Sequence, residues 1–539
     1  MTVRRVMGIE TEYGVLAPGN PAANPMLLSG QVVTTYRALA ARAGARPAAR
    51  WDYDDEDPLA DARGFHLRRQ AAHPSMLTDD PRRPAPAGPA PHDAAPVILD
   101  DADDPSAANC ILTNGARLYV DHAHPEYSSP EVTGPRDAVL WDVAGERVML
   151  AASRAASGPP AGRELALYKN NVDGKGASYG THENYLVDRA LPFATLAELI
   201  TPFLVTRQVF AGSGRVGLGP RGDEPGFQMA QRADYIEAEV GLETTLRRPI
   251  VNTRDEPHAE RSRWRRLHLI LGDANLFEAA TYLKLGTTSL VLWVLERLDE
   301  LAGAGVDARR ELAALRLADP VGEVRRVSRD VDLVAKLELA DGRSMTALEV
   351  QETYADVIER ALGVLGGAPD AETTAVLGRW RSVLTRLAAD PLDCAREVEW
   401  VAKRRLLEGM RRRDGLAWDH PRVHALDLQW SDVRPERSVY QRLVASGAVE
   451  RLVDEDAVAD AVLHPPTDTR AYFRGEVMAR YPEQVTAASW DSVIFDVPGA
   501  TALQRVPMLD PLRGTRAHLG ALLERSADAG ALLAALRGT

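Results

Sequence analysis

The spacing of the hydrophobic residues changes near residue 276, and this change constrains the fold more than any other feature of the sequence. From about 107 to 275, β-prone runs alternate with turn residues. From about 276 to 450, apolar residues recur at helical spacing, as in 290–298 and 350–365. We therefore expect a strand-rich part followed by a helix-rich part, with a further strand over 3–16.

Length and composition indicate a globular protein. The 539 residues are 45% hydrophobic and 26% charged, which excludes collagen, coiled coil and wholesale disorder. No apolar run approaches the roughly 18 residues of a membrane helix, and no signal-peptide pattern is present. With only two cysteines, these features predict a cytoplasmic protein that does not bind membranes. The net charge of −13 argues against nucleic-acid binding.

Turn and proline signals divide the chain further. Asn114-Gly115 separates two β-prone runs and predicts a hairpin over 111–120, and 267–272 is another expected strand. Six prolines lie within 81–96, so we expect a mobile loop there. The Pro465-Pro466 pair marks a second boundary, after which we expect a small C-terminal domain.

Several motifs carry candidate chemistry, the first of them at the start of the chain. Strand alternation places Glu10 and Glu12 on one face. Adjacent carboxylates repel unless a cation lies between them, and such hard oxygen ligands suit Mg²⁺ with nucleotide phosphates. The alternative is a solvated strand face.

An acidic, imidazole-bearing loop follows the expected hairpin. Asp121 is a candidate nucleophile or general base, and Glu126 a candidate metal ligand. The alternatives are a turn or capping acid for Asp121 and a hydrogen-bonded surface pair for His122 and His124.

Two further segments bear glycines and arginines. The glycines of 174–180 form a loop that can approach phosphates, although its spacing is not that of a P-loop. His182 then lies on the same face as Asn184, as a metal ligand or as a satisfied core residue. Seven arginines lie within 247–266, where they would bind carboxylate or phosphate or form a solvated loop paired with nearby acids. His268 follows in an apolar strand.

Together these residues supply the groups used in Mg–nucleotide chemistry. In this order they resemble the Pup ligase/depupylase family of the carboxylate–amine ligase superfamily. The resemblance spans nearly the whole chain and rests on five blocks: Glu10/Glu12, Leu118-Tyr-Val-Asp with His124-Pro-Glu-Tyr, His182-Glu-Asn-Tyr, Arg266-Leu-His and Ala488-Ser-Trp-Asp.

The resemblance implies an α+β fold like that of glutamine synthetase. We expect a large domain over 1–463, whose antiparallel sheet cradles the active site and is packed with helices. An insertion of about 60–105 interrupts it, and a small C-terminal domain spans 464–539. The Pro-rich loop in the insertion would act as a gate over a groove that binds Pup.

The family has a branch that ligates the ubiquitin-like protein Pup to lysines and a branch that hydrolyses this bond. The Pro-rich insertion, the short block from Asp121 to Glu126 and the segment 170–180 favour the hydrolytic branch, whereas Gly8-Ile-Glu-Thr-Glu is spelled more like the ligases. We therefore expect the chain to cleave the isopeptide between the C-terminal Glu of Pup and a substrate Lys, and to deamidate the C-terminal Gln of Pup. The alternatives are a Pup–protein ligase that phosphorylates Pup Glu with ATP, a glutamate–cysteine ligase-type enzyme, and a catalytically silent nucleotide-binding regulator.

The resemblance also implies roles for single residues, with ATP and Mg²⁺ as cofactors. Asp121 would be the nucleophile or general base, and Arg232 would hold phosphate or the oxyanion. The implied metal ligands are Glu10, Glu12, Tyr119, Glu126, His182 and His268. The implied ATP-binding residues are Gly8, Glu10, Glu12, Arg117, Ser129, Asn184, Arg265 or Arg266, and Trp490, which would cover the adenine. The expected partners of this monomer are Pup and pupylated proteins.

Overall fold

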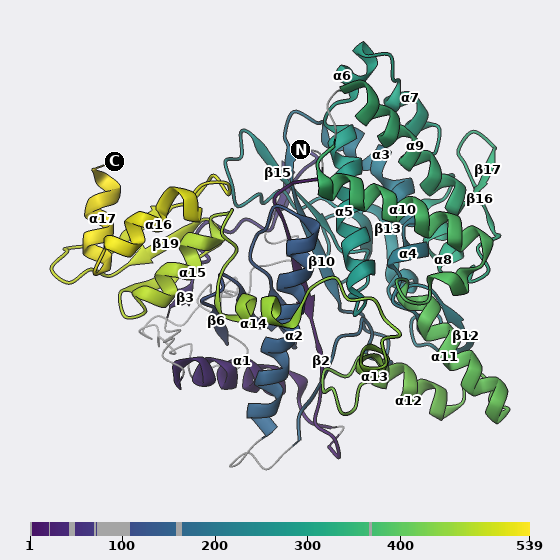
Figure 1. The fold of residues 1–539 in the computed structure, drawn as a ribbon, viewed down its shortest axis with the longest axis horizontal. Coiled ribbons are helices and arrows are strands. Elements are labelled where there is room, and N and C mark those ends of the chain that lie inside the picture. Colours follow the sequence, from purple (N-terminus) through teal and green to yellow (C-terminus); the bar gives the residue numbers. More distant parts are fainter. Residues whose placement is uncertain are drawn as a thin grey trace.

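The computed structural model describes residues 3–20, 22–42, 49–68, 72, 108–157, 164–365 and 369–538. A central sheet lies between a helical part and a C-terminal part, which Figure 1 shows on the right and the left. The Pro-rich run 81–96 lies outside the described residues. Its expected mobility and gating role therefore stay predictions.

The central sheet has six strands in the order β15-β10-β1-β8-β7-β6, and every neighbouring pair is antiparallel. Their bounds are β1 Met7–Glu12, β6 Asn109–Ile111, β7 Arg117–Asp121, β8 His124–Ser128, β10 Thr181–Asp188 and β15 Trp264–Leu269. The expected hairpin is confirmed as β6–β7, with Ile111 paired to Arg117 and Gly115 at a φ of 80°.

One face of this sheet is apolar and carries the core. Ile9, Tyr185 and Leu267 pack with residues of three helices, α2 (Pro135–Ser157), α3 (Phe193–Thr206) and α5 (Glu278–Leu295). Leu118 and Tyr127 on the neighbouring strands pack with α2 and with α1 (Pro25–Arg42). The other face carries most of the polar side chains of these strands; Glu183 and Arg265 are exceptions that lie on the covered face.

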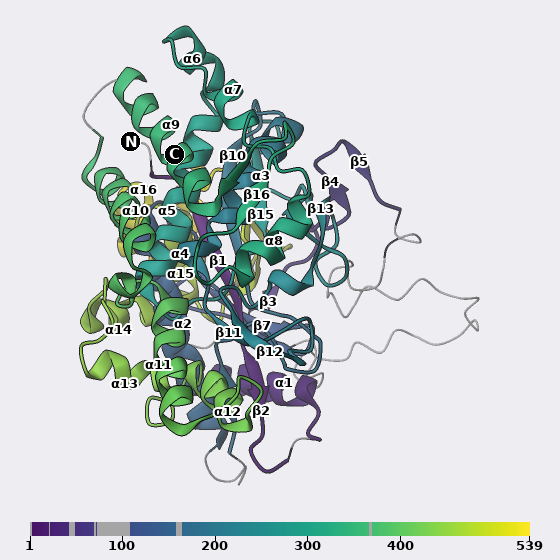
Figure 2. The same cartoon turned by 90° about the vertical axis from the view of Figure 1, so that its right-hand side faces the viewer.

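The helical part confirms the expected helical period, interrupted by one hairpin of β16 and β17. Every residue of α5 is buried, its polar ones included, so this helix forms the centre of the part. The other elements of the helical part are α4 Gln208–Ala211, α6 Leu298–Gly303, α7 Ala308–Ala313, α8 Pro320–Arg329, β16 Lys336–Glu338, β17 Ser344–Thr346, α9 Ala347–Leu365, α10 Ala371–Ala389, α11 Glu399–Asp414, α12 Pro421–Trp430, α13 Val439–Ala445 and α14 Glu455–Leu463. Figure 2 views these helices after a quarter turn.

Short strands complete the large part. Residues 3–16 form two strands rather than the expected single one, because β2 leaves the central sheet and pairs with β9. The chain bends at Gly14, where a Cβ would lie 2.2 Å from Tyr179 Oη. The remaining bounds are β2 Gly14–Leu16, β4 Ala60–Asp61, β5 Phe65–His66, β9 Ala166–Tyr168, β11 Arg215–Leu218, β12 Glu224–Gln228, β13 Ile236–Gly241 and β14 Arg248–Asn252.

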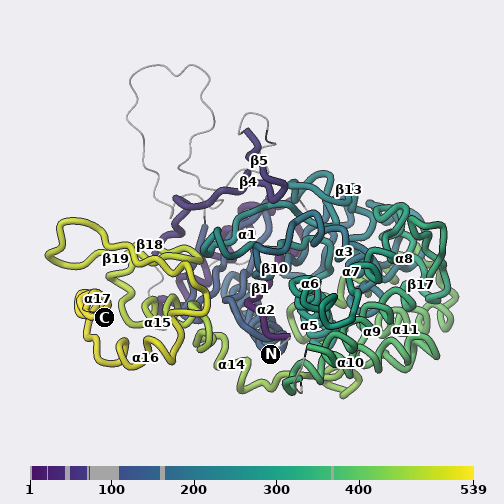
Figure 3. The backbone as a smooth tube through the Cα atoms, turned by 90° about the horizontal axis from the view of Figure 1, so that it is seen from above, coloured from purple at the N-terminus to yellow at the C-terminus, as the bar shows by residue number. Residues whose placement is uncertain are grey.

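The C-terminal part begins after α14, near the expected boundary, and recruits a strand from far upstream. Its sheet has the order β20-β19-β18-β3, and β3 (Arg50–Trp51) pairs in parallel with β18. Its other elements are α15 Ala471–Arg480, β18 Val485–Ala488, β19 Ser492–Phe495, β20 Gln504–Pro507, α16 Arg516–Arg525 and α17 Ala529–Arg537. Figure 3 shows this part beside the sheet, seen from above. None of the described helices combines the length and the apolar character that crossing a bilayer would take.

Candidate functional site

Antiparallel pairing gathers the polar side chains of distant strands on one face of the central sheet. Glu10 lies opposite His182 on one side and Ser128 on the other, and Glu12 lies opposite Glu126. Paired residues share a face and alternate residues repeat it. The face carries Gly8, Glu10, Glu12, Arg117, Tyr119, Asp121, Glu126, Ser128, His182, Asn184, Arg266 and His268.

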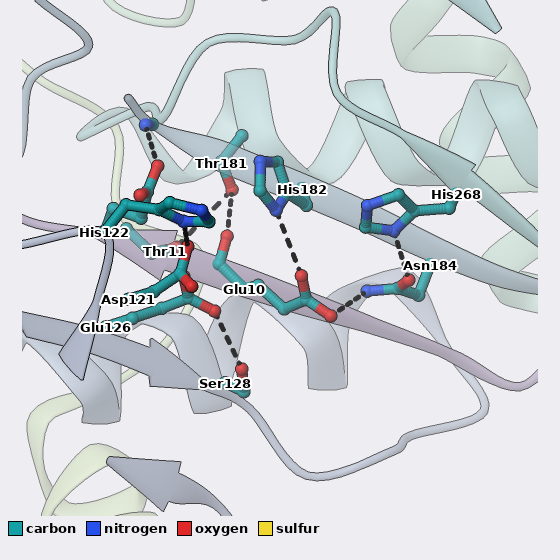
Figure 4. Close-up of polar contacts among 12 residues, drawn as sticks. Glu10, Thr11, Asp121, His122, Glu126, Ser128, Thr181, His182, Asn184 and His268 are labelled. Atoms are coloured by element: carbon teal, nitrogen blue, oxygen red, sulfur yellow. Dashed lines mark hydrogen bonds and ion pairs between the residues drawn. The ribbon is translucent and has the colours of Figure 1, made fainter. Parts of the chain in front are cut away.

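Among the residues that the structure describes, two groups could hold a metal ion, and Glu10, His182 and His268 form the first. Glu10 Oε2 lies 3.1 Å from His182 Nδ1, and Asn184 Nδ2 donates to Glu10 Oε1 at 3.0 Å. Figure 4 shows the Glu10 carboxylate between these two side chains. Burial and the neighbouring Arg266 guanidinium hold the pKa of His268 well below its usual value. The neutral imidazole that results is the form that binds metals.

The second group consists of three carboxylates, Glu12, Asp121 and Glu126, whose oxygens lie within 4.8 Å of one another. The Tyr119 hydroxyl donates a short hydrogen bond to Glu126. Burial, together with the facing Asp121, Glu10 and Glu12, raises the pKa of Glu126 well above its usual value. Crowded acids of this kind fit a divalent cation, which would neutralise their mutual repulsion.

Asp121 ends β7 at a tight two-residue turn. It pairs with His124 across the hairpin, and the turn residues His122 and Ala123 have φ values of 43° and 77°. L-residues other than Gly, Asn and Asp rarely adopt these angles at both positions of a turn. His122 Nδ1 lies 2.8 Å from Asp121 Oδ2. The short sequence between Asp121 and Glu126 thus forces a strained turn next to the candidate catalytic acid.

Three connected cavities follow the polar face of the sheet. The first cavity is lined by Gly8, Ser129, Asn184, Arg470 and Trp490, among others. The second cavity contains Arg117, Tyr119, Glu126 and His268, and shares Glu10, His258, Arg266 and Trp490 with the first. The third cavity contains Glu12, His124, Arg232 and Arg248, and shares Asp121, His122, His182 and Thr244 with the second. Asp121 therefore lies where the second and third cavities meet.

Aromatic and cationic groups line the second cavity beside these acids. The Arg117 guanidinium lies over the Trp51 ring at 4.0 Å and over the Tyr119 ring at 3.8 Å. Trp51 in turn meets Trp490 edge to face at 5.1 Å. Trp490, from the C-terminal part, therefore contacts the residues of the second cavity from above the sheet.

Arg232 lies at the inner wall of the third cavity. It is 1% exposed, and its Nη1 donates to the Thr181 carbonyl at 3.5 Å. Burial and the nearby Arg248 lower its pKa to about 10. Gly180 passes close by with a φ of 149°, and a Cβ there would lie 2.8 Å from Arg232 Nη1. A buried arginine with a like-charged neighbour favours an anionic ligand.

The structure brings nearly all the expected site residues to this face, and it separates Arg265 from Arg266. Arg265 lies on the opposite face, where it donates to the Leu191 carbonyl at 2.8 Å and lies over the Phe193 ring. The alternation of β15 leaves only Arg266 in the cavities. Gly176 of the glycine loop lines the third cavity, which also contains Arg232.

Sequence reasoning gave no role to several lining residues. Arg248 and Arg254 belong to the arginine-rich run, which was a usable signal, and His258 lies in the same run. Glu131 ends the acidic loop, but its pairing with Arg470 links segments more than three hundred residues apart. Arg470 lies in no motif, so nothing in the sequence pointed to it.

Comparison with known proteins places the chain in a family. The family model described as "Pup-ligase protein" matches residues 5–494. The chain belongs to the Pup-ligase protein family. It is 54% identical to the Pup deamidase/depupylase of Mycolicibacterium smegmatis over 97% of both chains.

Two solved structures of this family share the fold. A crystal structure of the complex between Pup and its ligase PafA matches with a TM-score of 0.73 and 27% identity, covering 97% of this chain and 91% of that one. The Pup ligase PafA in complex with ADP matches with a TM-score of 0.67 and 33% identity, covering 77% of this chain and 89% of that one. The expected α+β fold is confirmed.

Proposed function

We propose that this chain is a depupylase and Pup deamidase, with Pup and pupylated proteins as partners of a monomeric enzyme. It hydrolyses the isopeptide bond between the C-terminal Glu of Pup and a substrate Lys, and converts the C-terminal Gln of Pup to Glu. The observation that carries this is the 54% identity, over 97% of both chains, with a Pup deamidase/depupylase. The matched Pup ligases of known structure are less similar, at 27% and 33% identity.

Both reactions replace the C–N bond of a γ-carboxamide by a C–O bond, and the nitrogen leaves with a proton as an amine or ammonia. The Asp121 carboxylate either attacks the carbonyl carbon or takes a proton from the water that attacks it. Either step requires the carbonyl at the junction of the second and third cavities, which Asp121 lines. Arg232 lines the third cavity and would stabilise the developing oxyanion.

The proposed cofactors are Mg²⁺ and ATP. A family member binds ADP, which supports a nucleotide site here. The carboxylates of Glu10, Glu12 and Glu126, the imidazoles of His182 and His268 and the Tyr119 phenol are donors that fit divalent cations. When bound, the Mg²⁺ ion would supply positive charge that stabilises the developing oxyanion, and ATP would complete its coordination.

The first cavity would bind the nucleoside of ATP, and the second cavity would bind its phosphates. Ser129, Asn184 and Trp490 would hold the nucleoside in the first cavity. Arg117 and Arg266 line the second cavity and would bind the phosphates. Amide hydrolysis is downhill, so the nucleotide would complete the site without being consumed.

The test is cleavage of a purified Pup conjugate in the presence of Mg·ATP. We expect free Pup ending in Glu and an unmodified substrate Lys, and we expect folded Asp121→Asn protein to leave the conjugate intact. An intact conjugate with the unaltered protein, combined with new conjugate and ADP from Pup ending in Glu and a Lys-bearing protein, would instead indicate a ligase.

A further inference from the structure

A buried cluster of three charged residues joins the C-terminal part to the end of β8. The cluster consists of Glu131, three residues beyond β8, and Arg470 and Arg474, at the start of α15. Arg470 and Arg474 are 3% and 0% exposed. Glu131 and Arg470 also line the first cavity, together with Trp490. The cluster therefore lies beside the proposed nucleotide pocket.

The two arginines of the cluster form hydrogen bonds to several segments of the chain. Arg474 binds both oxygens of Glu131 and donates to the Gly115 carbonyl at 2.9 Å. Arg470 donates to Glu131 at 2.7 Å, to the His258 carbonyl at 2.5 Å and to the Met508 carbonyl at 2.7 Å. A planar guanidinium that meets a carboxylate with two bonds fixes orientation as well as distance.

Trp490 is held by the same arginine that binds Glu131. Arg474 Nη1 donates to the Trp490 carbonyl at 3.0 Å, and its guanidinium lies over the Trp490 ring at 4.9 Å. The indole also meets the Trp51 ring edge to face at 5.1 Å and packs against the apolar core of the C-terminal part. Arg474 thus contacts both the backbone and the ring of the residue that lines the first and second cavities.

Stabilising the junction between the C-terminal part and the central sheet does not by itself explain this charged cluster. Removing three charges from water is costly, and apolar side chains of similar volume often stabilise a packed junction as well or better. The junction already has an apolar core that includes Ile111, Trp51 and Phe473. What the charged cluster adds is a fixed direction for Arg474, and with it for the Trp490 indole.

We propose that Glu131, Arg470 and Arg474 are positioning residues that set the Trp490 indole against the nucleotide, so that nucleotide affinity depends on this cluster. The proposal rests on the proposed use of ATP. It concerns residues outside the metal groups and away from Asp121. It therefore predicts an effect on nucleotide binding that is separate from the chemical step.

The experiment measures ATP affinity by isothermal titration calorimetry, in Mg²⁺, for Arg474→Lys, Trp490→Phe and the double variant. We expect Arg474→Lys to weaken ATP binding about tenfold, since a lysine lacks the fork that orients the ring. Because Arg474 acts through Trp490, the two losses should not add. The double variant should bind ATP as tightly as whichever single variant binds it less tightly. Turnover of a Pup conjugate by Arg474→Lys at saturating ATP should stay close to that of the unaltered protein.

The matched control is Arg379→Lys in α10. Arg379 also forks onto a carboxylate, Glu450, and pairs with Glu397, but it lines none of the three cavities. We expect its ATP affinity to be unchanged. If Arg474→Lys does not fold, Glu131→Gln replaces it, because this variant keeps both arginines and the side-chain shape.

Two results would overturn the inference. Unchanged ATP affinity in folded Arg474→Lys or Glu131→Gln would show that the cluster does not act on the nucleotide. Additive losses in the double variant would show that Arg474 does not act through Trp490. Absence of ATP binding by the unaltered protein would instead refute the proposed cofactor, so the two failures are distinguishable.

Discussion

At the scale of single residues, the site depends on how each acid is surrounded. Glu10 lies beside His182, Asn184 and Arg266, whereas Glu126 faces three other carboxylates. A bound divalent cation would reduce the repulsion among these acids. This crowding separates the proposed ligand-binding carboxylates from ordinary buried ion pairs such as Glu183–Arg207 beneath the sheet.

Asp121→Asn keeps the size of the side chain but removes the basic oxygen. We expect the rate of conjugate cleavage to fall by about 10²- to 10⁴-fold, the usual contribution of a positioned acid–base group. Cleavage is followed by gel electrophoresis, and ATP affinity, measured separately, should change little. A folded Asn variant with an unaltered rate would remove Asp121 from the mechanism.

Glu131 gives a pH prediction that does not involve catalysis. Burial opposes its ionisation, but Arg474 and Arg470 outweigh burial and lower its pKa from 4.5 to about 2. A depressed carboxyl pKa contributes stability that is present above pH 4.5 and is lost as the pH falls towards 2. The free energy of unfolding of the unaltered protein should therefore fall more steeply in this window than that of Glu131→Gln, by up to about 1.4 kcal/mol per pH unit. Equal slopes in denaturant titrations would contradict the assignment.

At the scale of elements, the sequence predicted what one strand does alone but not which strands become neighbours. Strand alternation correctly placed Glu10 and Glu12 on one face, and Asn114-Gly115 correctly predicted the β6–β7 hairpin. The register that sets His182 opposite Glu10 and His268 opposite Asn184 joins strands separated by many residues. Local patterns singled out His182 and His268 but carry no information on such pairings, and the family resemblance implied that both are metal ligands.

Long-range strand pairing also explains why the sequence did not predict the sheet of the C-terminal part. Its sheet takes β3 from residues 50–51, and two residues give no strand signal of their own. The choice between Arg265 and Arg266 stayed open in the sequence for the related reason that the facing direction of β15 is set by its partner β10.

The turn after Asp121 gives a prediction for one element. Ala123→Gly should relieve a left-handed backbone that costs an L-residue about 1–2 kcal/mol, and the greater unfolded-state entropy of glycine offsets part of this gain. We expect slightly higher stability in urea and slower conjugate cleavage, because a looser turn holds Asp121 less firmly. Ala190→Gly, in a turn without positive φ, is the control and should lower stability. Lower stability of Ala123→Gly would show that the turn is not strained.

At the scale of the whole molecule, the first and second cavities lie between the central sheet and the C-terminal part, and a nucleotide in them would contact both. Mg·ATP should therefore stabilise the folded protein, by about 2.7 kcal/mol at 100 times its dissociation constant. Thermal unfolding monitored with and without Mg·ATP measures this, and a chelator should abolish most of the gain. An equal gain in the chelator would show that the acidic groups do not hold a metal that binds the nucleotide.

The proposed function is hydrolysis of amide bonds at the C-terminus of Pup without consumption of the nucleotide. To test it, the protein is incubated with Mg·ATP and Pup ending in Gln, and the mass of Pup and the amount of ADP are followed together. We expect the mass change that replaces the terminal amide by a carboxylate, with far less than one ADP per Pup. Unchanged Pup, or one ADP formed for each Pup converted, would contradict it.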